Sequence, residues 1–229
     1  MTAMLEVDDL SVNFGGVHAL RNVGFTVNAG QIVGLIGPNG AGKSTLLNCI
    51  SGITAPTGGA VRLDGKPHGR TTPDVLAARG IGRVFQHPDL VGELSVLDNL
   101  LTARHRSMRS SVAAEWLGMP WVKVSEREAR DHVQGVAQRL GLQDHLQTLA
   151  ASLPYGHRKL VELGRAMVME SRLFLLDEPI AGLNETEIEK LATLVLALRE
   201  QPGVAVVLVE HNMGLVKRLC DHVVVLDAG

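Results

Sequence analysis

One octapeptide constrains the fold of this 229-residue chain more than any other part of its sequence. It fits the pattern G-x-x-x-x-G-K-[ST], and its residues are Gly37, Pro38, Asn39, Gly40, Ala41, Gly42, Lys43 and Ser44. The apolar run from Gln31 to Ile36 precedes it, as a buried strand would, and Lys43 to Ile50 has the pattern of a helix. A glycine-rich loop between a strand and a helix is typical of a phosphate-binding loop.

Each part of this loop has a chemical role. The glycines let the backbone curl until successive N–H groups point at phosphate oxygens. Lys43 brings a positive charge to the β and γ phosphates, and the Ser44 hydroxyl is a ligand for Mg²⁺. Thr45 completes the set of loop residues that we expect to bind a nucleotide. The loop alone does not distinguish a kinase, a GTPase and an ATPase.

A second apolar run, Leu173 to Leu176, ends in two carboxylates, Asp177 and Glu178. The carboxyl end of a parallel strand lies at the ligand-binding edge of its sheet, where Asp177 can hold the Mg²⁺ shell. Glu178 can then act as a general base toward a water that attacks the γ phosphate. The sequence contains no N-K-x-D motif for guanine recognition, and this argues against a GTPase.

Two further polar residues follow apolar strands. His211 comes after Val204 to Val209, and we expect it to contact the γ phosphate. Gln86 comes after Ile81 to Phe85, where its amide could ligate Mg²⁺ or the attacking water. Taken alone, a histidine here is more often a structural residue, and Gln86 a surface turn. Their position at strand ends, where ligands of parallel sheets collect, favours the functional interpretation.

Segments with strand and helix patterns alternate along the chain, which predicts an α/β fold with a parallel sheet. The first thirty residues alternate with the period of a strand around a turn at Gly15–Gly16, and another strand is expected near Val61. Residues 89–168 are expected to be helical.

Two capping boxes mark expected helix starts. Ser125 with Glu128 would open a helix that runs toward Leu140. Asn184 with Glu187 would open another, whose apolar face is formed by residues at helical spacing.

Composition limits the partners and the compartment. The formal net charge is −2, and the aromatic residues are four Phe, two Trp and one Tyr. A basic face and a base-stacking platform are therefore missing, and we expect no nucleic-acid partner. Cys49 and Cys220 lie in apolar stretches and are expected to be buried, reduced thiols. Apolar runs stay below the ~18 residues of a membrane span, so we expect a cytoplasmic chain that reaches a membrane only through a partner.

The order of these motifs resembles that of the ATP-binding subunits of ABC transporters, and the resemblance covers essentially the whole chain. It implies that Phe14 stacks on adenine, that Gln86 is the Q-loop glutamine and that His211 is the switch histidine. Asp177 and Glu178 correspond to the Walker B pair. ATP and Mg²⁺ are the cofactors implied.

The family signature, usually L-S-G-G-Q, corresponds here to Leu153, Pro154, Tyr155, Gly156 and His157. The serine hydroxyl is lost at Pro154, while Gly156 still stands at the start of a helix, whose N-terminus favours anions. We therefore expect Pro154, Tyr155, Gly156 and His157 to contribute to nucleotide binding.

The resemblance also implies an architecture. We expect a P-loop NTPase core with a parallel sheet, an N-terminal antiparallel β subdomain and an inserted helical subdomain. Residues 1–229 would form a single ABC-type ATP-binding domain, with its core at about 1–88 and 169–229 and the helical subdomain at about 89–168. Because the family usually continues beyond the position of Gly229, we expect a truncated C-terminus.

Several local sequences are similar to the ATP-binding subunit of branched-chain amino-acid importers. They are Leu153–Arg158, Phe85–Gln86, Gly182–Asn184 and Glu210–Met213. The similarity implies transmembrane permease subunits, a second ATPase subunit bound head to tail and, indirectly, a solute-binding protein. It places the chain at the cytoplasmic face of the cell membrane. Whether the ATPase pair is homomeric or heteromeric stays open.

Other functions are kept as alternatives. An ABC ATPase for another solute, of the urea or lipid type, has the same motifs, as does a soluble ABC-type ATPase that is not coupled to transport. A regulator that binds ATP without turnover is disfavoured by Glu178. The segment Leu101–Arg130 holds six basic and three acidic residues. It is either a satellite core with a solvated basic rim or a surface that faces a partner or anionic headgroups.

Overall fold

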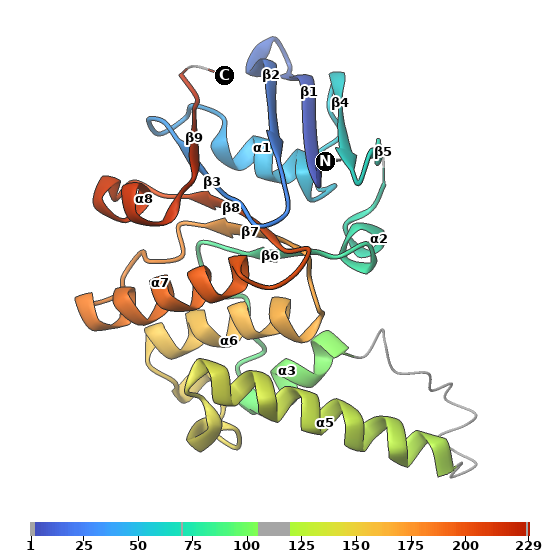
Figure 1. Ribbon diagram of the computed structural model, residues 1–229, viewed down its shortest axis with the longest axis vertical. Coiled ribbons are helices and arrows are strands. Elements are labelled where there is room, and N and C mark those ends of the chain that lie inside the picture. The colour runs from blue at the N-terminus through green and yellow to red at the C-terminus, as the bar shows by residue number, and fades with distance from the viewer. Residues whose placement is uncertain (1–2, 70, 105–119, 228) are drawn as a thin grey trace. The chain divides into compact units, whose positions relative to one another are not determined.

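The computed structural model describes residues 3–69, 71–104, 120–227 and 229, and contacts divide the chain into two compact units. The first unit comprises Met1–Gln86 together with Ser171–Gly229, and the second comprises His87–Glu170. The strands named in the following two paragraphs all belong to the first unit (Figure 1).

An antiparallel sheet is formed by the first part of the chain (Figure 1). Its strands are β1 (Leu5–Phe14), β2 (Val17–Val27), β4 (Gly58–Leu63) and β5 (Lys66–Pro67), in the order β2-β1-β4-β5. β1 and β2 pair as a hairpin around Gly15 and Gly16, as the sequence predicts. Leu10 and Val12 are buried while their neighbours are more exposed, which is the alternation of a sheet with one face in the core.

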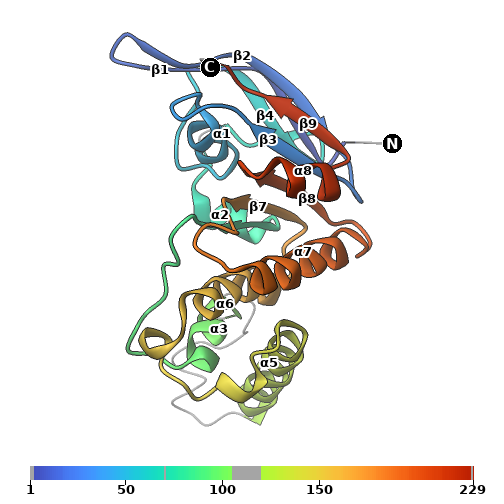
Figure 2. The same cartoon turned by 90° about the vertical axis from the view of Figure 1, so that its left-hand side faces the viewer.

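The second sheet is parallel and has the order β6-β7-β8-β3-β9 (Figure 1). Figure 2 labels four of its strands, β7, β8, β3 and β9. Its strands are β3 (Ile32–Ile36), β6 (Ile81–Val84), β7 (Leu173–Asp177), β8 (Ala205–Val209) and β9 (His222–Val225). Every residue of β7 and β8 is buried, as expected for the central strands of a parallel sheet covered on both faces. The continuous apolar runs of the sequence are therefore these strands, and the α/β fold is confirmed.

Four helices of the first unit follow strands or loops of the two sheets. They are α1 (Lys43–Ile50), α2 (Pro73–Ala78), α7 (Glu185–Arg199) and α8 (Met213–Leu219). α7 begins at the predicted capping box, because the Asn184 side chain accepts the Glu187 N–H and the Glu187 carboxylate accepts the Asn184 N–H. α8 is capped by Asn212, whose side-chain oxygen accepts the N–H of Leu215.

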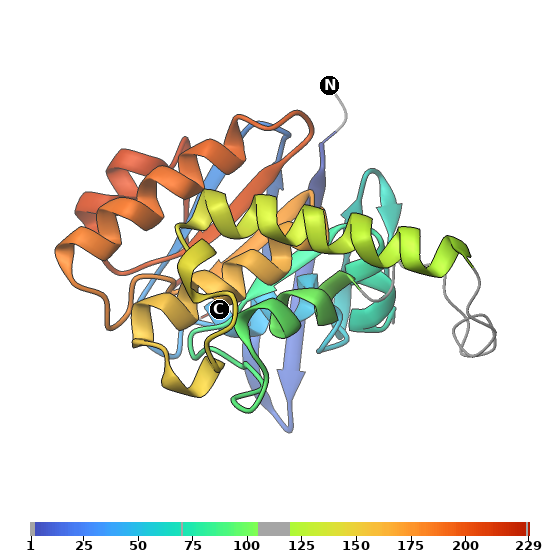
Figure 3. The ribbon, with the colours of Figure 1, turned by 90° about the horizontal axis from the view of Figure 1, so that it is seen from below.

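In the described part of the second unit, three helices pack against one another (Figure 3). They are α3 (Val96–Arg104), α5 (Pro120–Leu140) and α6 (Tyr155–Val168), and two short 3-10 helices, Gln143–His145 and Ala150–Ser152, lie between α5 and α6. At Gly164 of α6 an added Cβ atom would lie 2.7 Å from Leu140 and 2.9 Å from Leu100. A side chain at this position would require both leucine side chains to move, because α6 approaches the other two helices closely.

The predicted capping box of Ser125 and Glu128 is wrong. α5 begins at Pro120, so Ser125 lies inside the helix, where a residue cannot serve as an N-cap. The proline is itself a favoured first residue, because its missing N–H has no helical partner to lose. The pattern S-x-x-E also suits a solvated helix face, and Glu128 is exposed. Residues 105–119, which are half of the basic segment 101–130 and include Trp116, lie outside the described residues.

Both cysteines are free thiols. Cys49 is buried as expected, whereas Cys220 is only partly covered. Burial raises the pKa of each thiol to about 11. Within the described parts of the chain, helices do not reach the length and apolar character that crossing a bilayer requires.

The α7 cap provides a test of the local structure. Asn184→Ala should lower the free energy of unfolding by about 1 kcal/mol, because the Glu187 N–H loses its acceptor. Denaturant unfolding measures this, with Thr193→Ala on the exposed side of the same helix as the control, because alanine is there the better helix former. Equal free energies of unfolding for the two variants would contradict a stabilising role of the Asn184 cap.

Candidate active site

The loop between β3 and α1 has the geometry that its glycines predict. Gly37 and Gly42 have φ values of 154° and 95°. A Cβ atom at Gly37 would overlap the carbonyl oxygen of Leu226, and one at Gly42 would overlap that of Ala19. The loop therefore passes so close to its neighbours that a side chain at either position would displace it.

Lys43 is the first residue of α1, and its side chain contacts the beginning of this loop. Its side chain is buried, and Nζ donates hydrogen bonds to the carbonyl oxygens of Gly37 at 2.8 Å and Pro38 at 2.9 Å. An ammonium group has three hydrogens, so it can bind a further acceptor while it holds the loop. The first turn of α1 contains no acidic residue, which leaves the positive end of the helix dipole available to an anion.

Three polar side chains meet where β6, β7 and β8 end. Glu178 follows β7, and its Oε2 accepts a hydrogen bond from Nε2 of Gln86 at 2.7 Å. Its Oε1 lies 3.0 Å from Nε2 of His211, which follows β8. The three residues that the sequence predicts for hydrolysis are therefore joined through one carboxylate.

Glu178 also has an unusual backbone. Its φ is 46°, in the left-handed region that costs a residue other than glycine about 1–2 kcal/mol. The backbone N–H of Glu178 donates to the carbonyl of Val209 at 3.0 Å, so the neighbouring strand holds this conformation in place. Strain of this kind persists where the surroundings over-determine a residue, and it is common at functional sites.

Asp177 is linked to the phosphate-loop helix through a residue that the sequence analysis missed. Nη2 of Arg83, in β6, donates to Oδ2 of Asp177 at 3.3 Å. Nη1 of Arg83 donates to Oδ1 of Asn48 at 2.7 Å and to Oγ of Ser51 at 3.0 Å, both at the end of α1. The signal that could have identified Arg83 is its charge inside the apolar run 81–85.

Arg83 and Asp177 form a buried ion pair. Their side chains are 9% and 11% exposed. Burial lowers the pKa of the Arg83 guanidinium, and the carboxylate of Asp177 opposes that change. The guanidinium also lies over the ring of Phe85, 4.6 Å from its centre. Arg83 thus contacts α1, the end of β7 and the residue before Gln86.

The other predicted residues occupy different parts of the chain. Phe14 ends β1 and is 53% exposed. Ser44 and Thr45 belong to the first turn of α1. In the second unit, Pro154 is the N-cap of α6, and Tyr155, Gly156 and His157 form the first turn of that helix.

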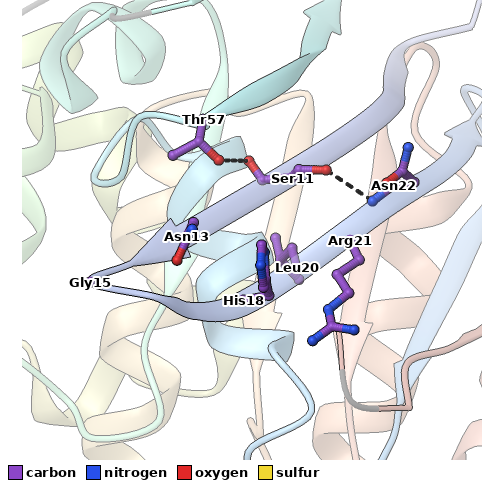
Figure 4. A pocket seen from close by; sticks show the side chains of 8 residues that line it. All are labelled: Ser11, Asn13, Gly15, His18, Leu20, Arg21, Asn22 and Thr57. Atoms are coloured by element: carbon purple, nitrogen blue, oxygen red, sulfur yellow. Dashed lines mark hydrogen bonds between the residues drawn. The ribbon is translucent and has the colours of Figure 1, made fainter.

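A polar pocket of about 680 Å³ lies on the β1–β2 hairpin (Figure 4). Its lining residues are Ser11, Asn13, Gly15, His18, Leu20, Arg21, Asn22 and Thr57. The Ser11 hydroxyl accepts the Asn22 N–H, and the Thr57 hydroxyl donates to the Ser11 carbonyl. Phe14, the residue after Asn13, is not among the residues that line this pocket. Residues 37–45 do not line this pocket.

The buried ion pair leads to a stability prediction. Arg83→Met should lower the free energy of unfolding by roughly 3–5 kcal/mol, because it leaves the Asp177 carboxylate buried without its cation. Arg62→Met is the matched control, since Arg62 pairs with Glu6 and Asp8 at a solvated surface and should change stability by less than about 1 kcal/mol. Denaturant unfolding measures both, and similar losses in the two variants would refute the importance of the buried pair.

Comparison with known proteins identifies the family. Residues 20–181 match the family model described as "ABC transporter". The chain is 38% identical to the high-affinity branched-chain amino acid transport ATP-binding protein BraF of Pseudomonas aeruginosa over 226 residues, which are 99% of this chain and 89% of BraF. It is 36% identical to LivG of Escherichia coli K12, a protein of the same description, with the same coverage of both chains.

A solved structure gives the same result for the fold. The ADP conformation of MJ1267, an ATP-binding cassette of an ABC transporter, superposes with a TM-score of 0.86 at 31% identity, covering 100% of this chain and 89% of that one. The family match, the 38% identity to BraF over 99% of this chain and the shared fold agree with the arrangement of polar residues at the strand ends. The chain therefore belongs to the ABC transporter family and is one of its ATPases.

Proposed function

We propose that this chain is the ATP-binding and ATP-hydrolysing subunit of an importer for branched-chain or related amino acids. The observation that carries the hydrolytic part is the Glu178 carboxylate, which is hydrogen-bonded to both Gln86 and His211. The solute class is supported by BraF and LivG, whose names describe branched-chain amino acid transport.

ATP would bind with its phosphates in the loop of residues 37–45. Lys43 supplies the positive charge, and the N-terminus of α1 supplies backbone N–H groups. Phe14 would stack on the adenine, a contact that tolerates different bases. Its exposed ring at the end of β1 is compatible with that role.

Mg²⁺ would be held by oxygen atoms of Ser44, Asp177 and Gln86. Hydroxyl, carboxylate and amide oxygens are the hard ligands that this ion prefers, so the donor set fits. The ion, when bound, neutralises charge on the phosphates during transfer. Arg83 donates to Oδ2 of Asp177 and to Asn48, and so it orients this carboxylate relative to α1.

Hydrolysis needs a group that accepts a proton from the attacking water, and we assign this role to Glu178, which follows directly after β7. A neutral His211 can donate from Nε2 to one oxygen of the carboxylate, while the Gln86 amide donates to the other. Both contacts fix the orientation of the Glu178 carboxylate before the reaction, which lowers the entropy cost of catalysis.

The proposed assembly involves other subunits. Pro154, Tyr155, Gly156 and His157 at the start of α6 would face the nucleotide of a second ATPase subunit bound head to tail, as a homodimer or a heterodimer. The first turn of α6 has no acidic residue, which favours an anion there. The second unit, residues 87–170, would be the helical subdomain. Permease subunits would hold the chain at the cytoplasmic face of the membrane, and a solute-binding protein would act through them.

Glu178→Gln tests the hydrolytic role. The variant should bind ATP with unchanged affinity and release phosphate about 10²–10⁴ times more slowly, because glutamine keeps the shape but cannot accept the proton. Equilibrium titration with ATP and a phosphate-release assay measure the two quantities. Glu189→Gln, on the exposed side of α7, is the control. Phosphate release near the wild-type rate would remove Glu178 as the base.

Transport is tested by coexpressing the chain with permease subunits, a second ATPase subunit and a solute-binding protein of the branched-chain type. Uptake of labelled leucine should require this chain and be competed by isoleucine and valine, and not by urea. Lys43→Ala should abolish uptake, because the triphosphate loses its lysine partner. ATP-dependent uptake of another solute, without leucine uptake, would favour the alternative importer class.

A further inference from the structure

Glu210 is a buried carboxylate that the proposed mechanism does not use. It follows directly after β8, whose five residues are all apolar and buried, and it is itself only 3% exposed. Burying an ionisable group costs free energy unless hydrogen bonds compensate it. An apolar residue would be the cheaper continuation of this strand, so the contacts of Glu210 require an explanation.

Its two oxygens bind two different loops. Oε1 accepts a hydrogen bond from the N–H of Ile180 at 3.2 Å, and Oε2 accepts one from the N–H of His211 at 3.2 Å. Ile180 lies two residues after Glu178, in the loop between β7 and α7. One carboxylate therefore connects the loop that carries Glu178 with the loop that carries His211.

These bonds complete a closed set of contacts. The Glu178 N–H donates to the carbonyl of Val209, and the Glu178 carboxylate lies 3.0 Å from His211 Nε2. Together with the bond from Ile180 to Glu210, they join the two segments at three points, and the bond from His211 to Glu210 lies within the second segment. The distance between the Glu178 and His211 side chains is thus set by backbone groups on both sides.

The electrostatic surroundings agree with a constrained position. Burial raises the pKa of Glu210, and the negative charge of Glu178 acts in the same direction. The two backbone N–H groups and His211 oppose this change. The charge of Glu210 also contributes to the raised pKa of the Cys220 thiol, after burial and the charge of Asp221.

We propose that Glu210 is a positioning residue for ATP hydrolysis: its carboxylate joins the loops of Glu178 and His211 and holds the two side chains at hydrogen-bond distance. The inference rests on the proposed roles of Glu178 and His211. Glu210 acts through these residues and touches neither ATP nor water in the reaction.

Glu210→Gln is the test. Glutamine keeps the size of the side chain, but its NH₂ group cannot accept the N–H of Ile180 or His211, so one link is lost. We expect kcat for ATP hydrolysis to fall about 10–100-fold from the misplacement. KM for ATP should stay within about twofold, because the phosphate loop is untouched.

Glu187→Gln is the matched control. Glu187 is also a carboxylate that accepts a backbone N–H from the end of the same loop, at Asn184, but it has no link to the His211 loop. Glutamine suits this capping position as well as glutamate. The control should therefore keep the wild-type kcat, and a general effect of losing a charge near the loop would show in both variants.

A double variant separates positioning from plain structural damage. If Glu210 acts through Glu178, then Glu178→Gln with Glu210→Gln should be about as slow as Glu178→Gln alone. An additive loss in the double variant would overturn the proposal. Wild-type kcat of Glu210→Gln, measured beside a slow Glu178→Gln, would also overturn it and leave the proposed function intact.

Glu210→Asp covers the case in which the glutamine variant does not fold. Aspartate keeps the charge and shortens the side chain by one methylene, so it can no longer span both loops. It should lower kcat with KM unchanged, and a wild-type kcat for Glu210→Asp would refute the positioning role. If Glu178→Gln itself hydrolysed ATP normally, the proposed function would fail first, independently of Glu210.

Discussion

Parallel pairing of β6, β7 and β8 brings the carboxyl ends of three strands to one edge of the sheet, and the active-site arrangement depends on this register. Val84 lies opposite Leu176, and Asp177 lies opposite Val209. Gln86, Glu178 and His211 each follow one of these strands within two residues. A slip of one residue in any pair would turn alternate side chains to the other face of the sheet and separate the three groups. The apolar side chains of β7 and β8 therefore stabilise the arrangement of Gln86, Glu178 and His211 as well as the fold.

Two charged residues interrupt this apolar framework, and both connect parts of the site. Arg83 joins Asp177 to the end of α1, and Glu210 joins the two loops that follow β7 and β8. Buried charges of this kind add little net stability compared with apolar residues of similar size. Their effect is directional, because each fork of donors or acceptors fixes the orientation of its partners. The site thus combines a sheet that sets the coarse position of each residue with buried polar contacts that set its orientation.

The sequence is most informative where structure depends on neighbouring residues. The phosphate loop, the apolar runs of the parallel sheet, the hairpin turn at Gly15–Gly16 and the cap at Asn184 all follow from local patterns. Ser125 shows the limit of such patterns, because a cap and a solvated helix face can have the same spacing. The contacts of Arg83 and Glu210 could not be predicted from such local patterns. Their partners Asp177 and Ile180 are 94 and 30 residues away, and only the folded chain brings the groups together.

The two native thiols make this protein convenient for chemical labelling. With a pKa of about 11, only about one thiol in ten thousand is ionised at pH 7, and the thiolate is the form that reacts with maleimides. A cysteine introduced at an exposed position, where its pKa is close to the ordinary value, would react far faster than Cys49 or Cys220. Spectroscopic probes can therefore be attached at a chosen site while both native cysteines are kept. The raised pKa of both native thiols thus allows site-specific labelling of this chain at an introduced cysteine.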